Sequence, residues 1–139
     1  MLRDLVRKIS NGNESFVGKN VGIVDERGEI ASVVNGVCML DVGKRTDVMS
    51  NCSKDYGIRV LVRSMGIDVV ATDEIGSNED IDAIYYASTC GVSLLFTMHG
   101  NSIEDLINNK KINEMIKNKM FENIVFLNKD KSYRINKVG

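Results

Sequence analysis

Apolar residues recur along the chain with two different spacings, which predict helices and strands in alternation. Helical spacing marks four segments: 2–9, 56–65, 81–88 and 112–120. A further helix is predicted to open at Ser102, with Asp105 in the capping-box position. Short apolar runs predict buried strands at 20–24, 68–72 and 92–97. Strands that alternate with helices in this way predict an α/β fold with a mainly parallel sheet flanked by helices.

Two parts of the chain depart from this alternation. Residues 28–53 are rich in Gly, Asn, Asp and Ser, and they predict a long functional loop with no more than a short strand or turn. The segments 123–127 and 133–135 predict two closing strands arranged as an edge hairpin. A chain of 139 residues is long enough for one domain with a real core, so we expect 1–139 to belong to a single domain.

Charge is nearly balanced over the whole chain but unevenly distributed along it. With 18 Lys and Arg against 19 Asp and Glu, the composition argues against a general coat of nucleic acid, and no nucleic-acid partner is expected. Residues 66–109 carry eight acidic side chains and no Lys or Arg, and carboxylates there could serve a magnesium ion. The basic segment 110–139 favours a solvated helix face over a surface for an acidic partner, a lipid or nucleic acid.

Cysteine usage and hydropathy bear on the cellular compartment. The three cysteines are odd in number and lack C-x-x-C spacing, which fits a reduced cytosolic protein and neither a disulfide framework nor a zinc site. No apolar run approaches the length needed to cross a bilayer. We therefore expect a cytoplasmic protein.

Acidic residues follow the predicted strand 68–72 and suggest phosphate chemistry. Asp73 and Glu74 have the form of a Walker B element, in which the first carboxylate holds magnesium and the second orients or deprotonates the attacking water. Taken alone, such a pair more often marks the start of a solvated loop. In open α/β sheets, however, ligands bind outside the carboxyl ends of the strands, where this pair is expected to lie.

Polar side chains also follow the two other predicted strands. His99 comes after 92–97 and could donate to a γ-phosphate, although a half-buried histidine with a structural hydrogen bond is the commoner case. After 20–24 comes a third cluster: Asp25, Glu26, Arg27 and Glu29. Three strands that end in polar clusters at one sheet edge indicate a binding site more strongly than any one of them alone.

Two arginines are candidates for contacts with phosphate or with a neighbouring subunit. A guanidinium group matches phosphate oxygens with two parallel hydrogen bonds, which makes Arg45 and Arg63 candidates. Such arginines more often pair with nearby carboxylates, and Asp41, Asp47 and Asp68 are close in sequence. The chain has no G-x-x-x-x-G-K-[ST] segment to cradle phosphates with backbone amides. By its own residues, it therefore holds only part of a nucleotide site.

Six segments carry a family resemblance that extends over nearly the whole chain: Leu2–Ser10, Val21–Ala31, Asp41–Val48, Leu61–Met65, Asp73–Gly76 and His99–Leu106. In the same order, they resemble the stage III sporulation protein AA family. This family belongs to the secretion-type ATPases, which have a RecA-like P-loop NTPase core. It is tied to the channel between mother cell and forespore in endospore-forming bacteria.

The resemblance implies roles for the residues that match the family's motifs. Asp25 and Glu26 resemble an Asp box with a carboxylate near the γ-phosphate, Asp73 and Glu74 resemble Walker B, and His99 resembles the His box. The expected site is therefore composed of catalytic Glu26, Glu74 and His99, cofactor contacts Asp25, Arg27, Arg45 and Arg63, and the metal ligand Asp73. The expected cofactors are ATP and Mg²⁺.

The same resemblance implies a core truncated before its first helix, because in the family this helix directly follows the Walker A segment. The parent protein would hydrolyse ATP in a hexameric ring, peripheral to the membrane, with membrane-embedded sporulation channel proteins as partners. Residues 1–139 alone would hydrolyse little or nothing. Two alternatives stay open: a non-catalytic assembly or binding module of the same complex, and a receiver-like signalling domain with Asp25 as phosphoacceptor and Lys129 as its weak lysine candidate.

Overall fold

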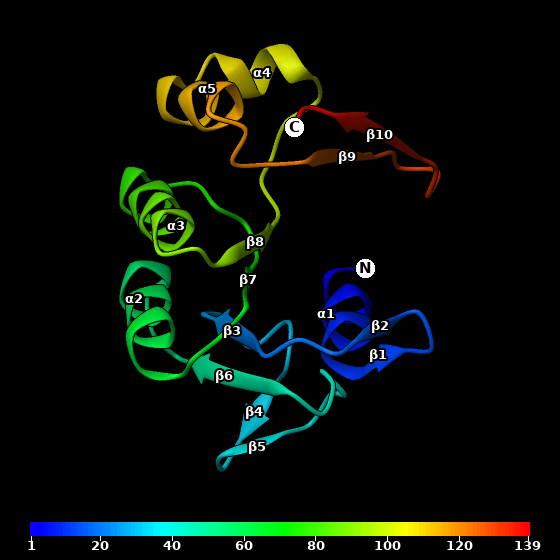
Figure 1. Ribbon diagram of the computed structural model, residues 1–139, viewed down its shortest axis with the longest axis vertical. Coiled ribbons are helices and arrows are strands. Elements are labelled where there is room, and N and C mark those ends of the chain that lie inside the picture. The colour runs from blue at the N-terminus through cyan, green and yellow to red at the C-terminus, as the bar shows by residue number, and fades with distance from the viewer. The chain divides into compact units, whose positions relative to one another are not determined.

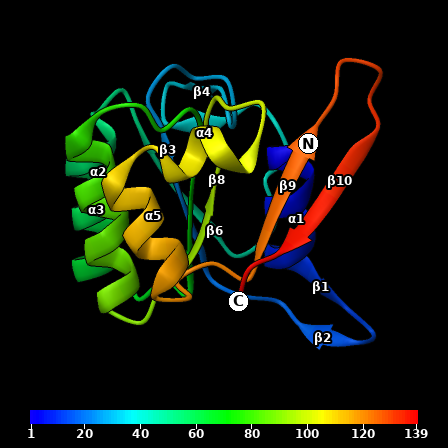
Figure 2. The same ribbon diagram turned by 90° about the horizontal axis from the view of Figure 1, so that it is seen from above.

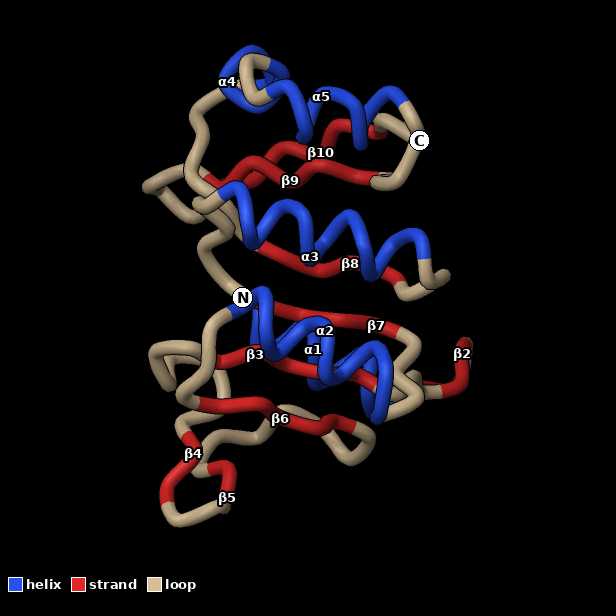
Figure 3. The backbone as a smooth tube through the Cα atoms, turned by 90° about the vertical axis from the view of Figure 1, so that its left-hand side faces the viewer, coloured by secondary structure: helices blue, strands red, loops and turns tan.

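The computed structural model describes residues 1–139, which form two compact units, Met1–Met98 and His99–Gly139 (Figure 1). The first unit is built on a four-stranded parallel sheet in the order β6-β3-β7-β8 (Figure 3). Its strands are β3 (Val21–Asp25), β6 (Thr46–Ser50), β7 (Val69–Thr72) and β8 (Ser93–Phe96). The predicted mainly parallel sheet is therefore confirmed.

Three helices cover the two faces of this sheet: α1 (Leu2–Asn11), α2 (Lys54–Ser64) and α3 (Asn78–Thr89). Figure 2 shows α1 on one face, with α2 and α3 on the other. The three layers explain why β3 and β7 are buried along their whole length, since a parallel sheet with helices on both faces leaves its central strands no side open to water.

The face of the sheet toward α1 holds the main apolar core. Its buried members are Val6, Val21, Ile23, Ile30, Ala31, Val42, Val69 and Ala71. Burying a side chain such as Ile23 completely contributes about 1.5–3 kcal/mol. Ile30 and Ala31 come from the loop after β3, so this loop is part of the core and is held against the sheet.

The opposite face is in close contact with α2. A Cβ atom added to Gly22 on β3 would lie 3.0 Å from side-chain atoms of Leu61 and Ile67, and one added to Gly57 on α2 would lie 2.8 Å from Val24. Glycine on both elements thus lets the helix approach the strand. Because α2 follows β6, its first turn lies at the carboxyl edge of the sheet.

Residues 28–53 contain more regular structure than their composition predicts. They hold the antiparallel hairpin of β4 (Val33–Val34) and β5 (Val37–Cys38) as well as β6, which is an edge strand of the main sheet. The prediction of a long loop here was wrong. An edge strand is only partly buried, so β6 can carry Thr46, Asp47 and Ser50, and these polar residues hide the strand pattern.

Serine side chains cap the starts of α2 and α3. Ser77 caps α3, its Oγ accepting a hydrogen bond from the Asp80 N–H at 3.0 Å, and the Asp80 carboxylate accepts from the Ser77 N–H at 3.3 Å. Ser53 caps α2 in a similar way by accepting from the Tyr56 N–H at 3.3 Å. A second small hairpin, β1 (Gly12–Asn13) with β2 (Phe16–Val17), follows α1.

The second unit contains two helices and an antiparallel hairpin: α4 (Ile103–Ile107), α5 (Lys110–Lys117), β9 (Asn123–Leu127) and β10 (Tyr133–Lys137). The predicted hairpin is confirmed, but it forms a two-stranded sheet of its own and not the edge of the main sheet. Leu106, Ile112 and Met115 are the buried apolar residues of this unit. None of the helices in either unit has the length and apolar character to span a membrane.

Candidate functional site

The carboxyl edge of the sheet brings together the acidic residues that follow β3 and β7. Val24 pairs with Thr72 in the parallel register, so Asp25 and Asp73 come at the same level on neighbouring strands. The Thr72 hydroxyl donates to the Val24 carbonyl oxygen at 3.1 Å and ties the two strand ends together. The expectation that these acidic clusters would meet at one sheet edge is met for the two central strands.

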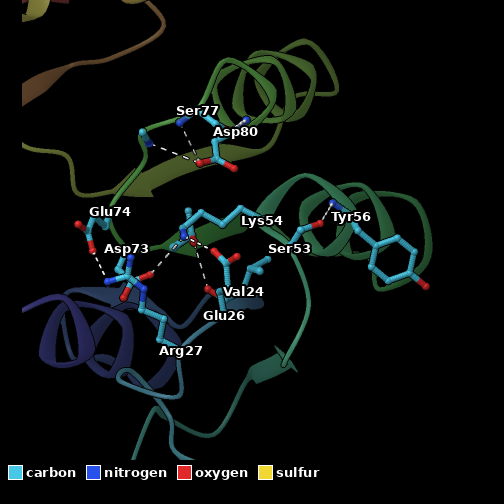
Figure 4. Close-up of polar contacts among 12 residues, drawn as sticks. Val24, Glu26, Arg27, Ser53, Lys54, Tyr56, Asp73, Glu74, Ser77 and Asp80 are labelled. Atoms are coloured by element: carbon cyan, nitrogen blue, oxygen red, sulfur yellow. Dashed lines mark hydrogen bonds and ion pairs between the residues drawn. The ribbon is translucent and has the colours of Figure 1, made fainter.

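A lysine lies among these carboxylates. Lys54 is the first residue of α2, its side chain is 5% exposed, and its Nζ is 2.5 Å from Glu26 Oε2 and 4.0 Å from Asp73 Oδ1. Figure 4 shows its side chain reaching from the start of the helix toward both acidic residues. Sequence reasoning missed Lys54. The signal that could have found it is Ser53, three positions before Tyr56, because serine is a preferred helix cap and Lys54 is the next residue.

Asp73 lies in an environment that disfavours its charge. Burial raises the pKa of the Asp73 carboxyl; Lys54 and a backbone hydrogen bond act to lower it, and Asp25 and Glu29 add to the rise. Its Oδ1 is buried and accepts no hydrogen bond. A buried carboxylate oxygen without a donor is an unusual feature that calls for a charged or hydrogen-bonding ligand.

This carboxylate fits the magnesium ion that the family implies. Mg²⁺ in nucleotide sites is bound through one or two carboxylates, with substrate phosphates and water completing its ligands. The chain has no group of three or more His, Cys, Asp or Glu side chains placed to hold a metal without such help. Asp73 is therefore suited to a cation that arrives with the phosphates of a nucleotide.

Glu74 is held in place by contacts from both neighbouring strand ends. Its backbone has a φ of 42°, in the left-handed region, and its N–H donates to Thr97 Oγ1 at 2.9 Å. Ile75 N–H donates to the Thr97 carbonyl oxygen at 2.8 Å. The Glu74 carboxylate pairs with Arg27 at 2.8 Å, and both side chains are exposed. A non-glycine residue in this conformation is uncommon and persists where surrounding contacts determine it.

Asp25 is buried and accepts hydrogen bonds from the loop that follows it. Its Oδ1 accepts from the Ile30 N–H at 3.1 Å, and its Oδ2 accepts from Ala31 at 2.8 Å and Ser32 at 3.3 Å. Both oxygens thus have backbone donors, which argues against a phosphoacceptor role because phosphoryl transfer needs an accessible oxygen. The cofactor contact expected of Asp25 stays a prediction.

Within the chain, the two candidate arginines lie away from the carboxylates. Arg45 directly precedes β6, at the amino edge of the sheet, and its Nη1 donates to the Ser10 carbonyl oxygen at 3.3 Å. Arg63 lies in the last turn of α2, and its Nε donates to the Tyr86 hydroxyl at 3.4 Å. Their predicted contacts with phosphate or a neighbouring subunit stay predictions. His99 begins the second unit, so its place in the site also stays a prediction.

Comparison with known sequences relates this arrangement to a family. The profile of the family "Sporulation stage III, protein AA" matches residues 1–137. Stage III sporulation protein AA of Bacillus subtilis (strain 168) is 37% identical over 131 residues, which is 94% of this chain and 43% of that protein. The chain thus spans less than half the length of this curated relative. The resemblance inferred from the six segments is confirmed.

Among solved structures, the X-ray structure of the Legionella pneumophila ATPase DotB has a similar fold. The TM-score is 0.56 at 12% sequence identity, and the match covers 96% of this chain and 38% of that one. At this identity the likeness concerns the fold alone. It confirms the predicted P-loop NTPase fold class.

Proposed function

This chain belongs to the stage III sporulation protein AA family, and we propose that it carries the metal-binding and water-activating carboxylates of an ATPase. The observation that carries the proposal is the carboxyl edge of the sheet, where Asp73 has a buried oxygen without a hydrogen-bond donor and Glu74 follows it. An ATPase with the same fold supports the assignment.

The proposed roles follow from the positions of the side chains. Asp73 would hold Mg²⁺ together with the phosphates, and the ion would neutralise phosphate charge as the bond to the γ-phosphate breaks. Glu74 would orient and deprotonate the attacking water, after its carboxylate leaves Arg27. Glu26 would assist from the neighbouring strand, and His99 would donate to the γ-phosphate. Arg27, released from Glu74, would be free to contact phosphate.

The proposal concerns the complete protein that contains these residues. Residues 1–139 contain no glycine-rich phosphate loop, and the chain spans 43% of its curated relative. We propose that the complete protein is a cytoplasmic ATPase, peripheral to the membrane, which forms a homo-oligomeric ring. Its work would serve a sporulation channel between mother cell and forespore, as the family resemblance implies, and the name of the relative supports a role in sporulation.

The test is a set of substitutions in that complete protein, numbered as here. Glu74→Gln should keep Mg²⁺-dependent binding of a fluorescent ATP analogue and lower phosphate release by roughly two to four orders of magnitude, as when a general base is removed. Asp73→Asn should weaken the Mg²⁺-dependent binding. His99→Ala should keep binding and lower hydrolysis. Glu79→Gln, an exposed acid in the first turn of α3, is the control and should change neither.

Two results would contradict the assignment. One is an equal loss of ATP binding in both carboxylate variants with the fold retained. The other is unchanged phosphate release in both. A wild-type protein that binds neither Mg²⁺ nor ATP would favour the alternative of a non-catalytic assembly module. The Arg27–Glu74 ion pair suits that alternative, because neither side chain would have to leave the pair.

A further inference from the structure

A lysine is buried at the start of α2, beside the carboxylates of the proposed site. Lysine is among the residues least often buried, and the cost of burying its charge must be offset by partners. Lys54 is 4% exposed, and its partners are the carboxylates of Glu26 and Asp73. These belong to two different strand ends, so one ammonium group connects them.

The fold places this ammonium group with little freedom. Ser53 caps the helix directly before Lys54, and Gly57 lets the same turn approach Val24 of β3 so closely that a Cβ atom would meet it at 2.8 Å. The first turn of α2 is therefore fixed against the strand that ends at Asp25. The direction of the Lys54 side chain follows from this contact and not from its carboxylate partners alone.

The charges at this sheet edge explain why a cation is needed there. Asp25 and Asp73 come at the same level on adjacent strands, and Glu26 follows directly. Carboxylates at such close quarters repel each other, and the repulsion favours either protonation or separation. Arg27 does not relieve it at Asp73, because it is paired with Glu74 on the exposed side. Lys54 supplies the positive charge inside the cluster.

We propose that Lys54 is a positioning residue of the ATPase site, which holds the Glu26 carboxylate beside Asp73 in the geometry that the reaction uses. This inference rests on the proposed function and deepens it. A second possibility is that the ammonium group binds phosphate directly. The short contact with Glu26, 2.5 Å, favours the positioning role because it engages the ammonium group with protein.

The two roles predict different kinetics. Removing a phosphate ligand weakens nucleotide binding, whereas removing a positioning cation leaves a site that binds but reacts poorly. Loss of Lys54 also removes a positive charge beside Asp73. The electrostatic attraction of the site for Mg²⁺ should therefore not weaken. Partners that orient a site's ligands typically contribute 10–100-fold to activity or metal affinity, and we expect a loss of roughly this size in kcat.

The experiment compares three lysine variants in the complete protein, numbered as here. Lys54→Met keeps the length and apolar stem but removes the charge, Lys54→Arg keeps a cation, and Lys19→Met removes an exposed lysine as a matched control. We expect Lys54→Met to lower kcat roughly 10- to 100-fold while KM for ATP with Mg²⁺ changes less than about threefold. Lys54→Arg should recover part of the lost kcat, and Lys19→Met should equal the wild type.

Circular dichroism and urea titration verify that each variant is folded, and Lys54→Gln replaces Lys54→Met with the same expectation if the latter does not fold. The inference is overturned if kcat is unchanged, if KM rises while kcat is kept, or if the arginine variant is as slow as the methionine variant. A wild-type protein without ATPase activity overturns the proposed function, and this inference with it. An active wild type with an equally active methionine variant overturns this inference alone.

Discussion

Replacing Asp25 by Asn should destabilise the chain strongly, although the two side chains have nearly the same shape. The Asp25 carboxylate is buried and accepts three backbone N–H groups, from Ile30, Ala31 and Ser32. Asn has one oxygen and one NH₂ group in place of the two oxygens. One side of the new amide must therefore present a donor to a donor.

The structure gives the magnitude of this effect. In the better orientation, the Asn oxygen keeps the bonds from Ala31 and Ser32, at 2.8 and 3.3 Å, and its NH₂ group meets the Ile30 N–H at 3.1 Å. One bond to a charged acceptor is lost, worth about 1.5–3 kcal/mol, and the other two lose their charge assistance. We expect the free energy of unfolding to fall by about 2–4 kcal/mol, out of a total of roughly 5–15 kcal/mol.

The assay is urea unfolding followed by circular dichroism at 25 °C, with linear extrapolation to water. Asp41→Asn is the control, because the Asp41 carboxylate also accepts a backbone bond, from Gly43 at 3.0 Å, but in an exposed loop where water can substitute. The control should lie within about 0.5 kcal/mol of the wild type. If Asp25→Asn lies there as well, Asp25 does not hold the loop and the reasoning is refuted.

Two further substitutions test the site and the helix that follows it. Because burial raises the folded-state pKa of Asp73, the folded chain binds its proton more tightly than the unfolded chain, so the ionised form destabilises the fold above that pKa. Asp73→Asn should raise the urea midpoint at pH 7, and this gain should shrink as the pH falls toward 3.8; an unchanged gain at low pH would contradict it. Ser77→Ala should lower the free energy of unfolding by about 1 kcal/mol through loss of the α3 cap, and a measured change near zero would show that the cap contributes nothing.

The sequence predicts the positions of the acidic residues well because two signals coincide there. An apolar run long enough for a buried strand ends at Val24 and again at Thr72, and each is followed at once by an acidic pair. Strand ends of a parallel sheet meet at one edge, so the order of elements alone brings the pairs together. The Ser77 cap is predictable for a similar reason, since the signal and the contact are three residues apart.

Other parts of the site depend on contacts that no local pattern reports. Strand β6 is an edge strand with polar residues, so the sequence pattern does not predict it. A prediction that lacks β6 cannot place the start of α2 at the carboxyl edge of the sheet. Lys54 then reads as a solvated lysine in the first turn of a helix, where a basic residue is electrostatically disfavoured. Its burial follows only from the approach of Gly57 to Val24, which is a tertiary contact. For the same reason Arg45 could not be placed at the amino edge, because it directly precedes the strand that the pattern hides.

Asp25 and Glu26 are neighbours in the chain, but the geometry of the strand gives their carboxylates different partners. Successive side chains of a strand point to opposite faces of the sheet. Asp25 follows Ile23 on the face toward α1, and its carboxylate binds the loop that contributes Ile30 and Ala31 to that core. Glu26 follows Val24 on the face toward α2, and its carboxylate meets Lys54 there. Two adjacent acidic residues can therefore have different partners, and the element on each face of the sheet determines which partner each carboxylate meets.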